Sequence, residues 1–140
     1  MQGHFEIQLV EMYFGVPILE ARCREPTLLV PETDVEMANA LLEQAYPRFA
    51  VVLNFRNLSH GASYGPEEEA EVHRNEPFVA LSKRLVAVVR YDAASLSSLV
   101  HAMRVNMMLR HSRATNFAPD FESAVRIARR AIDRSNVLTP

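Results

Sequence analysis

Two runs of consecutive apolar residues constrain the fold of this chain more than any other feature. The first runs from Ala50 to Leu53 and the second from Leu85 to Val89. A strand with one solvated face alternates apolar and polar residues, whereas a strand that is apolar at every position is typical of a sheet covered on both faces. We therefore expect both runs to be central strands of an α/β sheet, the first extending from Phe49 to Phe55.

The beginning of the chain has a different pattern. Apolar residues alternate with polar ones from Phe5 to Leu9 and again from Leu19 to Cys23, with Gly15 between the two runs. Alternation with a period of two predicts half-buried strands, and a glycine between them favours a turn. This pattern predicts an antiparallel hairpin at the edge of the sheet, and Pro17, which lacks an N–H donor, suits a strand start or an edge position.

Helical patterns follow each of the later strands. A capping box of Thr33 and Glu36 predicts one helix that ends by Tyr46, and Pro66 opens a second that Pro77 breaks or kinks. Phe78, Val79 and Leu81 are expected to pack inward from that segment. A third helix is expected from about Ser95 to Leu109, a short last strand from Ala114 to Phe117, and a final helix capped by Asp120 that buries Phe121, Ala124, Val125, Ala128 and Ile132.

Strands that alternate with helices predict a mostly parallel sheet joined by right-handed crossovers. The expected architecture is therefore α/β, with an antiparallel N-terminal edge hairpin and about four helices. The 140 residues show neither repeats nor a low-complexity linker, so we expect a single domain over residues 1–140.

Charge and composition exclude several classes of function. The formal net charge is −2 and the basic residues are scattered, which argues against nucleic-acid binding. No apolar run approaches the ~20 residues of a membrane span. Cys23 is the only cysteine and the N-terminus lacks the pattern of a signal peptide, so we expect a cytoplasmic protein.

The candidate metal ligands and catalytic groups are dispersed in the sequence. The five histidines include no pair at helical spacing, and the lone cysteine cannot form a zinc site. Glu67, Glu68, Glu69 and Glu71 are interpreted as a solvated first turn that complements the helix dipole. His60 beside Ser59 is interpreted as a solvated loop histidine. We therefore expect no metal, no cofactor and no catalytic residues.

The loop between the first apolar strand and the next helix resembles a known motif. In the STAS family of anti-sigma factor antagonist domains, called SpoIIAA-like, this loop contains an Asp-Ser-Ser-Gly group whose first serine is phosphorylated by a partner kinase. Here Gly61 to Gly65 overlies that group, Ser63 and Gly65 match it, and Ala62 and Tyr64 replace an aspartate and a serine. Asn54 stands at the strand-end aspartate position, and the element order of the chain also agrees with the family.

The resemblance implies a SpoIIAA-like fold and a non-enzymatic regulatory or adaptor function. The partner would be a protein, such as a kinase or an anti-sigma-type regulator, and Ser63 would be the candidate phospho-acceptor, although a helix cap is the alternative interpretation of this serine. The partner-binding residues predicted around this loop are Leu58, Ser59, His60, Ser63 and Tyr64.

A second hypothesis concerns the methionine-rich third helix. Met103 and Met107 share its core-facing stripe, and Val105 and Met108 lie off that stripe. These four residues could form a homodimer contact or the wall of a pocket for a small apolar ligand, whereas core packing is the alternative for Met103 and Met107. An enzymatic function is the third hypothesis, and no set of residues in the sequence favours it.

Overall fold

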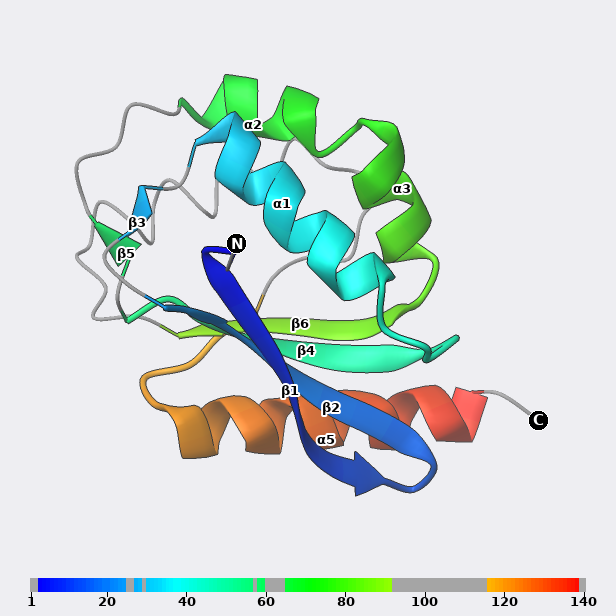
Figure 1. The fold of residues 1–140 in the computed structure, drawn as a ribbon. Helices are drawn as coiled ribbons and strands as arrows, with labels where there is room; N and C mark the ends of the chain where they lie inside the picture. Colours follow the sequence, from blue (N-terminus) through cyan, green and yellow to red (C-terminus); the bar gives the residue numbers. More distant parts are fainter. Residues whose placement is uncertain are drawn as a thin grey trace.

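The computed structural model describes residues 3–24, 27–28, 30–56, 58–59, 65–91 and 116–138. Its main feature is a five-stranded mixed sheet in the order β1-β2-β4-β6-β7 (Figure 1). β1 is antiparallel to β2, and every other neighbouring pair is parallel. This confirms the predicted parallel sheet with an antiparallel hairpin at its edge. The strands are β1 (Phe5–Tyr13), β2 (Val16–Cys23), β4 (Phe49–Asn54), β6 (Leu85–Tyr91) and β7 (Asn116–Phe117).

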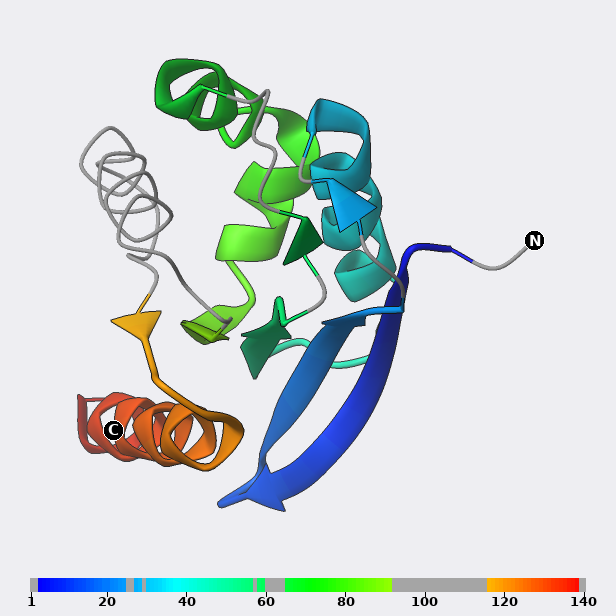
Figure 2. The same cartoon turned by 90° about the vertical axis from the view of Figure 1, so that its left-hand side faces the viewer.

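Helices cover both faces of this sheet. α1 (Pro31–Leu42), α2 (Pro66–Val72) and α3 (Glu76–Ser82) lie on one side, and α5 (Phe121–Leu138) lies on the other (Figures 1 and 2). None of these described helices is long and apolar enough to span a lipid bilayer.

The residues of β4 show why the sheet needs two layers of helices. Phe49, Val51 and Leu53 are buried in the core shared with α1 and α3, whereas Ala50 and Val52 are buried in the core shared with α5. Because neighbouring side chains of a strand point to opposite faces, each of these five positions faces a covering helix. This confirms the interpretation of the apolar run from Ala50 to Leu53.

The hairpin turn between β1 and β2 uses left-handed backbone conformations. Phe14 has φ 48° and Gly15 has φ 80°, as expected when a two-residue loop follows the right-handed twist of its strands. Glycine adopts this conformation without steric cost, whereas Phe14 does so in an exposed position, where 75% of its surface is accessible.

The start of α1 corrects the prediction made from the capping box. The helix begins at Pro31, and its N-cap is Val30. The Thr33 hydroxyl accepts a hydrogen bond from the Val30 N–H at 3.0 Å and donates one to the Val30 carbonyl at 3.1 Å. Thr33 is therefore the third residue of the helix and not its N-cap. Proline is favoured at the first helical position, so the helix begins at Pro31, before Thr33.

The helical segment around Pro77 is broken into two helices, as the sequence predicted. α2 ends at Val72, and α3 begins at Glu76 with Pro77 in its first turn, where a missing N–H costs no helical hydrogen bond. Leu81 is buried, but Val79 is 43% exposed, so its predicted inward packing is wrong. Val79 lies on the outer side of a short helix that has only one covered face.

The end of α1 is tied to the start of β6 by one side chain. The guanidinium of Arg84 donates to the carbonyls of Leu42 at 3.0 Å, Gln44 at 2.5 Å and Tyr46 at 2.5 and 3.0 Å. Its Cζ atom lies 5.3 Å from the centroid of the Phe49 ring. Arg84 therefore satisfies the carbonyl of the last residue of α1 and two carbonyls of the segment that follows the helix.

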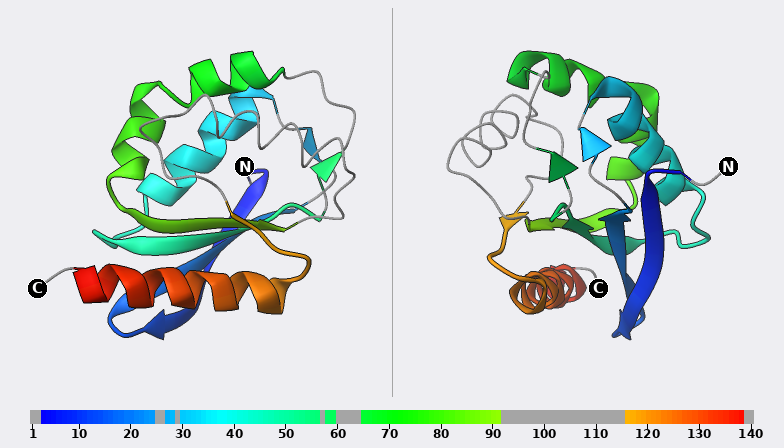
Figure 3. Two further views of the ribbon diagram at one scale, coloured as in Figure 1. Left: turned by 180° about the vertical axis from the view of Figure 1, so that it is seen from behind. Right: turned by 60° about the vertical axis from the view of Figure 1, so that its left-hand side comes forward.

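A second, two-stranded sheet lies beyond the ends of β2 and β4. It consists of β3 (Thr27–Leu28) and β5 (Leu58–Ser59), which pair in parallel (Figures 1 and 3). The sequence analysis did not predict it, because two-residue strands carry no periodic pattern.

The last predicted elements are partly described. β7 confirms the short strand before the final helix, and Asp120 accepts a hydrogen bond from the Ser123 N–H at 2.7 Å, as expected of a cap. In α5, Ala124, Val125, Ala128 and Ile132 are buried as predicted, and Phe121 is partly buried. The helix expected from about Ser95 to Leu109 lies outside the described residues.

Candidate functional site

The predicted partner-binding segment begins at β5 and leads to α2. Leu58 and Ser59 form β5, where they pair with Thr27 and Leu28 of β3. His60, Ser63 and Tyr64 lie outside the described residues. The structure resumes at Gly65, which is exposed and forms the N-cap of α2. The residues predicted for a dimer contact or ligand wall, Met103, Val105, Met107 and Met108, also lie outside the described ranges.

The strand end that precedes this segment is held by a buried polar group. The Asn54 amide donates to Glu20 Oε2 at 2.9 Å, and Gln8 donates to Glu20 Oε1 at 2.5 Å. Glu20 and Asn54 are each only 5% exposed. The side-chain Oδ1 atom of Asn54 accepts a hydrogen bond from the Arg56 N–H at 3.3 Å. These contacts fix the direction in which the chain leaves β4, since buried polar groups are costly to separate.

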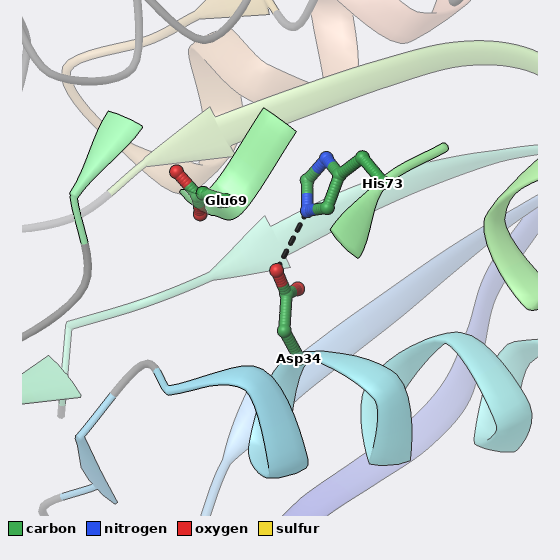
Figure 4. A group of neighbouring side chains, drawn as sticks. All are labelled: Asp34, Glu69 and His73. Atoms are coloured by element: carbon green, nitrogen blue, oxygen red, sulfur yellow. Dashed lines mark hydrogen bonds and ion pairs between the residues drawn. The ribbon is translucent and has the colours of Figure 1, made fainter. Parts of the chain in front are cut away.

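A second group of polar side chains lies between α1 and α2. It consists of Asp34 from α1, Glu69 from α2 and His73, the C-cap residue of α2, and one ligand atom from each lies within 4.8 Å of the others (Figure 4). Residues four apart share a helix face, so the spacing of Glu69 and His73 brings both side chains toward α1. The His73 Nε2 and Asp34 Oδ2 atoms are 2.6 Å apart.

Burial and neighbouring charges shift the pKa of His73 in opposite directions. The Asp34 side chain is 2% exposed and the His73 side chain is 22% exposed. Burial lowers the pKa of His73, but the hydrogen bond and the charge of Asp34, together with the charge of Glu69, outweigh it and raise this pKa above its ordinary value. The imidazole ring also stacks on Phe78 of α3, with 4.2 Å between ring centroids and an angle of 20°.

This cluster, Asp34, Glu69 and His73, was missed in the sequence analysis. The four glutamates of α2 were interpreted as solvated, which the structure supports for Glu67, Glu68 and Glu71 but not for Glu69, which is 5% exposed. Glu69 is buried because the face of α2 that carries it turns toward α1. The spacing of Glu69 and His73, four residues apart, could have indicated the cluster. A search restricted to pairs of histidines does not detect a glutamate and a histidine at this spacing.

The single cysteine is unsuited to nucleophilic chemistry. Cys23 is buried in the core under α1, and burial raises the pKa of its thiol to about 11, although the charge of Arg90 acts against this shift. A cysteine acts as a nucleophile only as the thiolate, which this environment disfavours near neutral pH.

Comparison with known proteins identifies the fold. No protein-family model matches the sequence, and no curated protein does. Among solved structures, the chain is similar to the crystal structure of an uncharacterized protein of the DUF3478 family with a SpoIIAA-like fold from Shewanella loihica PV-4. The TM-score is 0.52 at 14% sequence identity, and the similarity covers 91% of this chain and 98% of the other. This chain has a SpoIIAA-like fold. The fold expected from the sequence is thereby confirmed.

Proposed function

We propose that this protein is a regulatory or adaptor domain that acts by protein–protein contact through its contact segment, defined as residues 58–64. The observation that supports this most is the position of the segment in the fold. It lies in the chain between the central strand β4 and α2, the place at which the resemblance to anti-sigma factor antagonist domains implies a phosphorylated serine. Fold alone does not specify function, so the proposal depends on this position.

The flanks of the contact segment favour such a role. On one side, Asn54 and Glu20 hold the end of β4, and the first two residues of the segment itself, β5, pair with β3. On the other side, α2 is fixed by the fully buried Ala70 and by the contact of His73 with Asp34. A binding segment whose ends are already ordered loses less conformational entropy when a partner binds.

The charges beside the contact segment indicate how Ser63 could regulate binding. Glu67 and Glu68 follow Pro66 in the first turn of α2 and are both exposed. A phosphoryl group or a carboxylate at Ser63 would add like charge beside them and would have to be desolvated when a partner covers the contact segment. Weaker partner binding after phosphorylation is therefore the form of regulation that we propose.

The test compares partner affinity of wild type and Ser63→Asp. A partner is first isolated with the wild-type chain, and its affinity for each purified variant is then measured by calorimetry. We expect Ser63→Asp to weaken binding by about tenfold, which corresponds to about 1.4 kcal/mol, while the thermal stability stays unchanged.

The matched control places the same charge far from the contact segment. Val137 is 83% exposed near the end of α5, which lies away from β5 (Figure 1). Val137→Asp should therefore bind the partner as wild type does. Equal affinity of wild type and Ser63→Asp, or equal losses in both variants, would contradict the proposal and would favour the hypothesis of a small apolar ligand.

A further inference from the structure

We propose that Asp34, Glu69 and His73 form a binding site for a divalent transition-metal ion, with Zn²⁺ and Mn²⁺ as the best candidates. This site contains no residue of the contact segment, and its test requires no protein partner. It also departs from the expectation of no metal, which considered cysteines, pairs of histidines and the glutamates of α2 separately and did not combine Glu69 with His73.

The donor set selects the class of ion. One imidazole nitrogen and two carboxylate oxygens suit Zn²⁺, Mn²⁺ and Fe²⁺, whereas Ca²⁺ takes six to eight oxygen ligands. A protein site with three ligands leaves one position for water or another small ligand. His73 is 22% exposed, which gives an ion and this water a route to the cluster from solvent.

The geometry is close to that of a bound ion. Ligand atoms ~2.1 Å from a tetrahedral ion lie roughly 3.4 Å from one another. All three ligand groups are already within 4.8 Å of one another. The Nε2–Oδ2 distance of 2.6 Å is that of a hydrogen bond, so the structure shows the form in which a proton holds the two groups together. An ion that replaces this proton requires the two atoms to separate by less than about 1 Å.

The charges of the three groups also favour a divalent ion. Asp34 and Glu69 are buried, to 1% and 5% exposure, and a divalent cation between two carboxylates offsets the cost of burying their negative charge.

The surroundings orient the ligands before an ion arrives. Glu69 lies on α2, His73 follows it by four residues as the C-cap of this helix, and Asp34 lies opposite them on α1 (Figure 4). The stacking of His73 on Phe78 restricts rotation of the ring. Such support of the ligands is typical of metal sites, where it contributes to affinity. A bound ion would link α1 to α2.

The test uses the full chain without an affinity tag, freed of metal with a chelator. Titration with Zn²⁺ and with Mn²⁺ near neutral pH should show one equivalent of at least one ion binding, and the same ion should raise the melting temperature of the wild type. His73→Gln and Glu69→Gln should each lower the affinity by roughly 100-fold or more.

The matched control is an exposed pair of the same chemistry. His4 Nδ1 lies 2.8 Å from Glu36 Oε1, with side chains 56% and 35% exposed. His4→Gln should bind the ion with wild-type affinity. If His73→Gln does not fold, the metal affinity of Glu69→Gln tests the site, since this variant leaves the contact of His73 with Asp34 in place.

Two results would overturn the metal site. One is the absence of saturable binding by the wild type up to about 1 mM of both ions, which corresponds to a free energy weaker than about −4 kcal/mol. The other is binding by Glu69→Gln with undiminished affinity, which would place the ion elsewhere on the molecule.

Discussion

The contact between His73 and Asp34 predicts how the stability of the metal-free protein depends on pH. The folded state raises the pKa of His73 above its ordinary value, so folding favours the protonated imidazole. This contribution is complete below the pKa of the unfolded state, ~6.5, and is lost as pH rises through the higher folded-state pKa. We therefore expect the free energy of unfolding to fall over this window, with a slope of at most about 1.4 kcal/mol per pH unit from this group.

The burial of the pair sets the size of the effect of removing one partner. The Asp34 side chain is 2% exposed, so solvent screens its charge weakly. The charge of Asp34 raises the pKa of His73, and Asp34→Asn removes this charge. Of the other causes, burial lowers this pKa and the charge of Glu69 raises it. Breaking a buried pair from one side costs about 3–5 kcal/mol. The stability lost in Asp34→Asn should be largest at low pH and smaller above the window.

Urea denaturation of wild type, Asp34→Asn, His73→Gln and His4→Gln between about pH 5.5 and pH 8.5 tests this reasoning when a chelator is present. The exposed pair of His4 and Glu36 is the control, and its loss should cost less than about 1 kcal/mol. An NMR titration of the His73 ring checks the direction of its pKa directly. If wild type and His73→Gln show parallel stability curves over the whole range, the assignment of the pH dependence to His73 is refuted.

Three further predictions concern packing and association. Leu53 is 7% exposed, so Leu53→Ala should lower the free energy of unfolding by roughly 2–5 kcal/mol in urea, and a loss below about 1 kcal/mol would contradict its place in the core. Arg84→Met should cost roughly 2 kcal/mol by the same assay, because charged hydrogen bonds to several carbonyls are lost, and an unchanged midpoint would remove that role. Met108→Glu should shift any dimer to monomer in light scattering, whereas unchanged mass would count against the third helix as the interface.

Much of the architecture is predictable because the residue types of a segment show which of its faces are buried. Each apolar residue of β4 is buried against the helix that covers its own face of the sheet. Consecutive apolar residues from Ala50 to Leu53 therefore indicate that both faces are covered. Prolines were equally informative at Pro66 and Pro77, since a missing N–H restricts where a helix can begin. The start of α1 was predicted less well, because the hydroxyl of a threonine can close a helix from the N-cap or from inside the first turn.

The sequence by itself determined the strands of the five-stranded sheet, the described helices α1, α2, α3 and α5, the antiparallel edge and the burial of the central strands on both faces, because these depend on patterns within single segments. Only the tertiary structure decided which polar residues meet. Asp34 and His73 are 39 positions apart, and among the four similar glutamates of α2 only Glu69 is buried, because α1 packs against one face of that helix. No pattern within a single segment shows how one helix packs against another, so the Asp34, Glu69 and His73 cluster could be found only in the folded chain.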